Sequence, residues 1–348
     1  MNMPILDHSS IHTISGHEVL IVVPCLNEAS GIEPCLTSLL EGDPRLADAT
    51  LIVVDGGSTD PTRAIVARMA RRFPNMRMID NPRRLQSAGI NLAVRQCAEA
   101  HHRVLLRADA HALYPPGYAM RAAERLVQTG AAAVVVPMDS RGSTCFSRAA
   151  GWIVDTPLGS GGARHRGGHV SGEVEHGHHA AMDLDWFRRV GGYDPGFSHN
   201  EDAELDHRLR AAGGRIWMEA GLRLDYWMRP GPIALARQYL NYGRGRARTM
   251  RKHGIRPQPR QIAPAVNLIL LGVALLVTLA GLALGSPALT ALGLVWPLTY
   301  LAVLIAASLL TAWRHRSACG LLAGVALAAM HLPWGAGFLG ELLKKGRT

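Results

Sequence analysis

Two side chains that can bind a divalent cation stand close together near residue 110. The apolar run 104–109 ends in Asp109, and His111 follows after one intervening residue. A carboxylate and an imidazole at the end of a buried strand can hold a metal ion that also binds a diphosphate. The nitrogen ligand favours Mn²⁺ over Mg²⁺. The structural alternative is a strand-end aspartate beside an exposed histidine.

A second acidic cluster, Glu201 and Asp202, opens a helix that we predict over 202–212. Both side chains flank the apolar stripe of this helix, where a carboxylate below an open site can act as a general base. Two later acids are explained as ordinary i,i+4 ion pairs, Glu204–Arg208 and Asp206–Arg210.

Asp55 closes the apolar run 51–55 and is followed by a glycine turn, Gly56-Gly57. A carboxylate at a strand end beside such a turn can accept a hydrogen bond from a nucleobase N–H, or it can simply stabilise the turn. Asp60 and Pro61 suit the cap and the first position of the next helix, so we interpret Asp60 as structural.

A third cluster is rich in histidine and glycine. It contains five histidines, namely His165, His169, His176, His178 and His179. Zinc is conceivable, but no thiol accompanies them and the glycines indicate a loop. We therefore favour a loop beside the acceptor, the molecule that would receive a transferred group, over a metal site.

The elements that must position these residues alternate between strand-like and helix-like patterns. Apolar, β-branched runs occur at 19–24, 51–55, 77–80, 104–109 and 132–137, with helical periodicity between them. This order predicts a mostly parallel α/β sheet that binds ligands at the carboxyl ends of its strands. The first strand is not followed by GxGxxG, which argues against a nicotinamide dehydrogenase.

The formal net charge of +10 is concentrated near the C-terminal part of the chain. Residues 1–242 hold 25 arginines, no lysine and 26 acids, whereas residues 243–260 hold seven basic residues and no acid. The basic segment precedes 53 uncharged residues, which indicates a membrane surface with its lipids rather than nucleic acid. Gln238, Arg244 and Arg246 lie at this junction and can meet lipid phosphates or a nucleotide diphosphate.

The uncharged residues are long enough for two membrane spans, near 264–284 and 289–312, and a third uncharged stretch covers 317–340. The positive-inside bias places the basic segment in the cytoplasm and the turn at 285–287 in the periplasm. A third span would carry the basic tail outside against that bias, and the 331–335 interruption could let this stretch re-enter or lie in the interface. Because 24 uncharged residues suffice to cross, we predict three spans.

The first ten residues show no basic segment followed by an apolar run, so we expect no signal peptide. The five cysteines are scattered and include no CxxC motif, which predicts reduced core residues of a cytoplasmic domain. They are Cys25, Cys35, Cys97, Cys145 and Cys319.

Taken in order, these motifs resemble those of family 2 glycosyltransferases, which are inverting enzymes with the GT-A fold that use nucleotide sugars. The similarity covers about residues 18–250. It rests on Pro24–Glu28, Val54–Asp60, Arg84–Asn91, Asp109–His111, Gly191–Asp194 and Asn200–Asp202. His111 stands where the family usually has a second aspartate.

The resemblance implies a role for each matching position. Asp202 would be the catalytic base, with Glu201 on the acceptor side, and Asp109 and His111 would bind the metal. The nucleotide sugar would be bound by Pro24, Asn27, Glu28, Asp55, Arg84 and Asp109. The QxxRW motif of processive synthases is replaced by the segment containing Gln238, Arg244 and Arg246, which favours addition of a single sugar.

Three longer segments resemble the glucosyltransferases of succinoglycan exopolysaccharide assembly, namely 107–116, 200–217 and 238–249. This similarity implies a UDP-sugar donor, UDP-glucose, and a saccharide acceptor on polyprenyl diphosphate at the inner membrane. Two alternatives stay open, a polyprenyl-phosphate sugar synthase and a non-catalytic membrane module that binds nucleotide sugars or polysaccharide.

We therefore expect a cytoplasmic GT-A domain followed by a membrane anchor. The catalytic domain would occupy 1–242, with a nucleotide-binding half at about 18–139 and an acceptor half at about 140–242. The remaining expected segments are a basic linker at 243–263, two to three transmembrane helices within 264–340 and a basic tail at 341–348.

Overall fold

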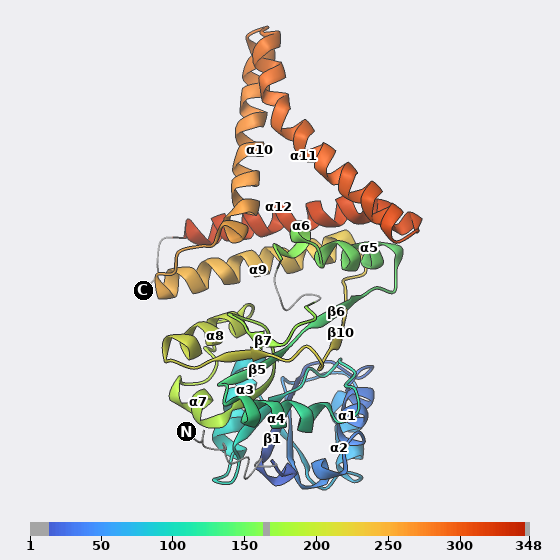
Figure 1. Cartoon of the computed structure of the whole chain (residues 1–348), viewed down its shortest axis with the longest axis vertical. Coiled ribbons are helices and arrows are strands. Elements are labelled where there is room, and N and C mark those ends of the chain that lie inside the picture. The colour runs from blue at the N-terminus through green and yellow to red at the C-terminus, as the bar shows by residue number, and fades with distance from the viewer. Residues whose placement is uncertain (1–13, 163–167, 345–348) are drawn as a thin grey trace, which may run out of the picture. The chain divides into compact units, whose positions relative to one another are not determined.

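The computed structural model describes residues 14–162 and 168–344, which form two compact units (Figure 1). The first unit comprises 14–137 and 168–224, and the second comprises 138–162 and 225–344. The segment 138–162 thus belongs with the C-terminal helices, although the sequence analysis assigns it to the acceptor half. The first ten residues, for which we expect no signal peptide, lie outside the described residues, as do His165, Lys345 and Arg347.

An eight-stranded sheet forms the centre of the first unit, in the order β3-β2-β1-β4-β8-β5-β9-β7. Neighbouring strands β3, β2, β1 and β4 all run parallel, as the alternation of strand and helix patterns predicts. The strands are β1 (Val19–Cys25), β2 (Thr50–Asp55), β3 (Met76–Asp80), β4 (Val104–Arg107), β5 (Ala133–Val136), β7 (Gly172–Glu173), β8 (His178–Asp183) and β9 (Ile216–Met218).

Alternate residues of β1 bury themselves on opposite faces of the sheet. Val19, Ile21 and Val23 pack on one face, against α1 (Ile32–Leu40), α2 (Thr62–Ala70) and α4 (Tyr118–Thr129). Leu20 and Val22 pack on the other, against α3 (Gln86–Cys97), α7 (Leu184–Arg189) and α8 (Glu201–Ala211). A strand buried on both faces reads as a continuous apolar run, which explains why this strand was predictable.

Strand β8 departs from the expected loop. It runs antiparallel to both β4 and β5, with Leu106 opposite Ala181 and Val134 opposite Ala181. Because it is antiparallel, its first residues lie at the edge where the parallel strands end. His178 and His179 therefore belong to a strand in the middle of the sheet, and the loop prediction is wrong for them.

The second unit contains a two-stranded sheet and the long C-terminal helices. Its elements are β6 (Met138–Arg141), α5 (Cys145–Val154), α6 (Pro157–Ser160), β10 (Leu224–Trp227), α9 (Pro232–His253), α10 (Pro259–Ala283), α11 (Pro287–Arg314), η3 (Ala318–Leu322) and α12 (Ala323–Leu342). Three of its segments are long and apolar enough to cross a membrane, at 259–283, 287–314 and 318–342. The three uncharged stretches of the sequence therefore all form helices of the expected kind.

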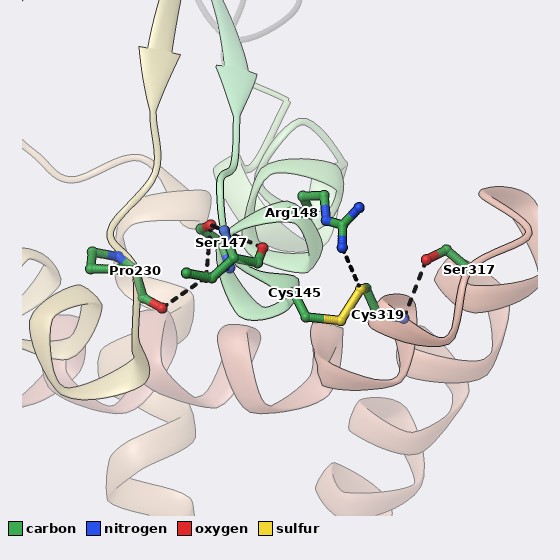
Figure 2. Close-up of a disulfide and its surroundings, with 7 residues drawn as sticks. Cys145, Ser147, Arg148, Pro230, Ser317 and Cys319 are labelled. Atoms are coloured by element: carbon green, nitrogen blue, oxygen red, sulfur yellow. Dashed lines mark hydrogen bonds between the residues drawn. A yellow bond between two sulfur atoms is a disulfide. The ribbon is translucent and has the colours of Figure 1, made fainter.

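A disulfide joins Cys145 to Cys319 within this unit (Figure 2). Cys145 is the first residue of α5 and Cys319 lies in η3, and these two elements pack together although they are 174 residues apart in sequence. The prediction that every cysteine is reduced is therefore wrong for this pair. The prediction failed because two cysteines so far apart in the sequence show no pattern that indicates their contact in the fold.

The other three cysteines are buried and free, as predicted. Burial, reinforced by the neighbouring Asp55 carboxylate, raises the pKa of the Cys25 thiol to about 12, and burial also raises the pKa of Cys35. Thiols with raised pKa values form little thiolate and are chemically inert.

The disulfide predicts a specific pattern of thiol protection. Alkylation of the unreduced, denatured protein followed by peptide mass mapping should modify Cys25, Cys35 and Cys97 but leave Cys145 and Cys319 unmodified. Replacing Cys145 by Ser should cost the protein about 2–4 kcal/mol, the usual contribution of a disulfide, and thus lower its melting temperature. Full alkylation of Cys145 and Cys319 before reduction would contradict the pairing.

Candidate active site

The loops that follow β1 and β2 are bound to each other at the carboxyl edge of the sheet. The Asn27 side chain accepts a hydrogen bond from the Thr59 N–H (2.8 Å), and the Asn27 N–H donates to Ser58 Oγ (2.9 Å). Glu28 N–H donates to Thr62 Oγ1 (2.8 Å). Asn27 thus holds these two loops together, with its backbone in the left-handed region (φ 57°).

Asp60 has a structural role, as the sequence predicts, but Pro61 rather than Asp60 is the N-cap of α2, which begins at Thr62. Its carboxylate accepts hydrogen bonds from the backbone N–H groups of Thr62 and Ala29, each at 3.0 Å. It therefore stabilises the start of α2 and also anchors the loop after β1.

Asp55 lies at the end of β2 with its side chain fully buried. Its carboxylate accepts from the N–H groups of Gly57 (3.1 Å) and Ser58, and from Arg63 Nη1 (2.6 Å). Burial opposes ionisation of Asp55, but the hydrogen bonds from Ser58 and Arg63 outweigh it and lower the pKa. Asp55 is an ionised acceptor that stabilises its own turn. Its part in binding a nucleobase stays a prediction.

Two more predicted nucleotide-side residues border the same edge. Pro24 lies in β1 opposite Val54 of β2. Arg84 follows β3 in the left-handed region (φ 57°), and its guanidinium lies beside Gly57, which itself has φ +86°. Left-handed non-glycine residues are costly and concentrate at functional sites.

Asp109 follows β4 and faces a histidine that the sequence did not pair with it. One carboxylate oxygen accepts from Gln86 Nε2 (3.1 Å), and the other lies 3.5 Å from His178 Nε2 on β8. Burial raises the pKa of Asp109, but the positive field of Arg107, His178 and His111 outweighs it, so the net shift is downward.

The predicted metal partner His111 lies on the β1 side of Asp109. Its Nδ1 is 3.2 Å from Glu28 Oε1, and its side chain is 69% exposed. The imidazole thus approaches the carboxylate of another residue predicted to bind the nucleotide sugar.

These donors have the chemistry of a divalent-cation site. Two atoms bound to one ion at about 2.1 Å each are roughly 3–3.5 Å apart, which the Asp109–His178 separation of 3.5 Å matches. Within 14–162 and 168–344 no three metal-type side chains converge, so a cation held by Asp109 and His178 would need further ligands. Partial shells are usual where phosphate oxygens complete the coordination.

Asp202, at the start of α8, is held on one of its two oxygens. Oδ1 is paired with Arg107, accepts from the Tyr193 hydroxyl (3.1 Å) and lies 3.3 Å from His179 Nδ1. Among the described residues no hydrogen bond reaches Oδ2. The carboxylate is thus oriented by three groups, while the second oxygen can accept a proton from a bound hydroxyl.

Behind Asp202, His179 connects two buried carboxylates. Its Nε2 lies 2.7 Å from Asp206 Oδ1, and the other oxygen of Asp206 lies 2.7 Å from His176 Nδ1. The histidine cluster therefore supports the acidic helix. The predicted Asp206–Arg210 pair is wrong, because the Asp206 side chain points inward and is 1% exposed.

The other predicted helical pair is confirmed. Arg208 binds Glu204 through Nε (2.9 Å) and Nη2 (2.6 Å). No pattern in the sequence distinguishes Asp206 from Glu204, since both stand four residues before an arginine.

The neighbouring carboxylates Glu201 and Asp202 ionise very differently. Burial and the negative charge of Asp202 raise the pKa of Glu201 to about 7. Burial acts against ionisation of Asp202 as well, but Arg107 and His179 outweigh it and hold its pKa well below the usual range. At neutral pH Asp202 is charged, and Glu201 titrates.

The remaining predicted residues lie in the second unit, on α9. Gln238 Nε2 donates to the hydroxyls of Tyr226 (2.6 Å) and Tyr242 (2.9 Å). Arg244 and Arg246 stand on the same helix. Their part in acceptor or diphosphate binding stays a prediction.

Comparison with known proteins identifies the enzyme class. Residues 20–191 match the family model described as glycosyl transferase family 2. The chain is 44% identical over 328 residues to the succinoglycan biosynthesis protein ExoA of Rhizobium meliloti (strain 1021), covering 93% of this chain and 94% of that one. The chain belongs to glycosyl transferase family 2. It is a glycosyltransferase.

The fold of this glycosyltransferase is also found in a solved structure. The mannosyltransferase PcManGT from Pyrobaculum calidifontis, in complex with GDP-Man and Mn²⁺, superposes with a TM-score of 0.59. The two are 21% identical, and the match covers 90% of this chain and 86% of that one. The GT-A fold with a mostly parallel sheet is thereby confirmed.

The buried pair His179–Asp206 predicts strong energetic coupling. Replacing His179 by Ala leaves the Asp206 charge without one of its partners, which costs about 3 kcal/mol for a buried pair. In a double-mutant cycle with Asp206→Ala, urea unfolding of the purified protein should give a coupling of about 1–3 kcal/mol.

The control is the exposed pair Arg68–Glu33, whose side chains are 59% and 48% exposed. Alanine variants of this pair should show a coupling below about 1 kcal/mol. Equal coupling in the two cycles would refute a structural role for the buried network.

Proposed function

We propose that this glycosyltransferase moves a sugar from a UDP-sugar, glucose in particular, to a saccharide carried on polyprenyl diphosphate, with inversion at the anomeric carbon. The named role of its relative in succinoglycan biosynthesis supports a place in exopolysaccharide assembly. The uridine base, the glucose and the lipid carrier rest on that resemblance.

The observation that carries the proposed mechanism is the orientation of Asp202. Arg107, Tyr193 and His179 all engage Oδ1, which leaves Oδ2 directed to accept the proton of an acceptor hydroxyl. As that proton moves to Asp202, the acceptor oxygen bonds to the anomeric carbon and the bond from this carbon to the UDP oxygen breaks. A fixed base supplies rate mainly through orientation and pre-arranged charge.

The nucleotide side would be formed by the loops after β1, β2 and β3. Asn27 and Glu28 shape this edge of the sheet. Asp55 keeps the second loop in place and would accept a hydrogen bond from the base, and Arg84 would supply positive charge. Asp109 would hold a divalent cation together with His111, as the sequence predicts, or with His178, which lies 3.5 Å from it. The ion would be Mn²⁺ in preference to Mg²⁺ and would supply positive charge to the departing diphosphate.

We place the enzyme in the inner membrane, with its catalytic unit in the cytoplasm, where nucleotide sugars are made. The three apolar helices and the basic residues of 243–260 support this location. Gln238, Arg244 and Arg246 on α9 would then meet the acceptor diphosphate or lipid phosphates.

The test of the base is Asp202→Asn in the full-length protein. UDP release from UDP-glucose, with polyprenyl-diphosphate-linked saccharide present, should fall at least about 100-fold, because a general base contributes about 10²–10⁴. The affinity for UDP-glucose should change little, since the group acts in the transition state. Equal release with polyprenyl phosphate as acceptor would instead favour the polyprenyl-phosphate sugar synthase.

Glu201→Gln is the matched control for this variant. We expect a milder loss and a changed pH profile. As pH rises through about 7, Glu201 becomes charged and makes Asp202 more basic, so wild-type turnover should rise. The Gln variant should lack that rise. A larger loss in Glu201→Gln than in Asp202→Asn would transfer the role of base to Glu201.

Metal dependence is tested separately. EDTA should abolish transfer and Mn²⁺ should restore it better than Mg²⁺. Asp109→Ala and His178→Ala should each weaken Mn²⁺ and UDP binding together, measured by calorimetry, because the ion joins the protein to the diphosphate. Full activity in excess chelator would rule out the cation.

A further inference from the structure

Helices α9 and α12 lie side by side in the second unit, and they run in the same direction (Figure 1). Leu235 of α9 shares a buried cluster with Met330, and Met250 shares another with Phe338. Later residues of α9 therefore meet later residues of α12 along nearly the whole pair.

The two backbones approach closely in the middle of this contact. A Cβ added to Gly243 would collide with the carbonyl oxygen of Trp334, and one added to Gly337 would collide with that of Leu240. Small residues at such positions allow helices to pack backbone to backbone. Helices α9 and α12 therefore form a closely packed interface.

Ion pairs join the C-terminal ends of α9 and α12. Glu341 is the sole acid after residue 242, and its side chain is 2% exposed. Its carboxylate lies 3.2 Å from Arg251 and 3.4 Å from Arg248 of α9, and 2.8 Å from Lys344. The end of α12 is therefore bound to the most basic part of α9.

Helix α9 cannot lie in the hydrocarbon core. It carries five arginines and one lysine and contains no acid. Each arginine at the centre of a spanning helix costs about 2.5–3.5 kcal/mol on insertion scales. A basic helix of this kind lies in the headgroup layer, where anionic phosphates meet its charges.

Helix α12 must lie at the depth of the helix that it contacts throughout. It also differs from the other two apolar helices in its surroundings. In the most apolar 18 residues of 318–342, which include most of α12, protein buries 44% of the stretch. The corresponding share is 17% for α10 and 6% for α11. The mean hydropathy of these stretches is 1.5 for 318–342, 2.5 for α10 and 2.0 for α11. Among the helices of the described residues, only α10 and α11 present the largely exposed apolar surface of a lipid-facing span.

We propose that α9 and α12 together form a surface that lies in the headgroup layer of the membrane, and that only α10 and α11 cross it. The C-terminus then lies on the same side as α9, opposite the turn at residue 285. This arrangement replaces the third span that the sequence predicts. It also keeps the basic tail on the side of the basic segment, as the positive-inside bias requires.

The test uses three variants of the full-length chain that each gain one cysteine. They are Arg256→Cys between α9 and α10, Ser286→Cys in the α10–α11 turn and Thr348→Cys at the end. Intact cells are treated with a membrane-impermeant maleimide before or after permeabilisation, and the wild type gives the background from native cysteines. Permeabilised samples establish that each new cysteine reacts.

We expect Thr348→Cys and Arg256→Cys to show the same labelling, and Ser286→Cys the opposite one. Thr348→Cys labelled from the side of Ser286→Cys means three spans and overturns the proposal. Arg256→Cys and Ser286→Cys on one side would overturn it too, because α10 would not cross. The labelling pattern does not depend on which sugar donor or acceptor the enzyme uses, or on whether the enzyme is active.

A charge exchange tests the contact itself. Glu341→Arg should lower the melting temperature, and Arg251→Glu added to it should restore part of the loss. The matched control adds Arg256→Glu, an exposed residue beyond the end of α9, and should restore nothing. Equal behaviour of the two double variants would remove the basis for placing α12 beside α9.

Discussion

The buried guanidinium of Arg107 is the interaction on which the candidate active site depends. Arg107 ends β4 and its side chain is 5% exposed, yet it pairs with Asp202 and lies 3.4 Å from Asp109. A charge removed from water is tolerated only when it is paired, so the two carboxylates are the partners that allow Arg107 to be buried. One residue thus connects the position suited to a metal with the position suited to a base.

The antiparallel strand β8 completes this arrangement from the opposite direction. Its first residues extend past the end of β4, so His178 faces Asp109 and His179 faces Asp202. A parallel strand at this place would have presented its carboxyl end here, and its two histidines would lie at the other edge. The strand direction, rather than the number of histidines, gives them their positions.

The second unit depends on contacts of another kind. Close backbone packing joins α9 to α12, and the Cys145–Cys319 disulfide joins α5 to η3. Together these contacts join residues 138–162 to residues 225–344 in one compact unit. Apolar length makes α12 a candidate span, and its neighbours determine how much apolar surface it has left for lipid.

The sequence by itself determined what local patterns encode. Periodicity located the parallel strands and helices, an uncharged stretch located the apolar helices, and the ordered motifs from Pro24 to Asp202 indicated the family. The tertiary structure decided the direction of β8, the inward turn of Asp206 toward His179, the His178–Asp109 approach and the partner of Cys145. Each of these joins residues far apart in the chain, and spacing along a sequence carries no information on which distant groups share a buried volume.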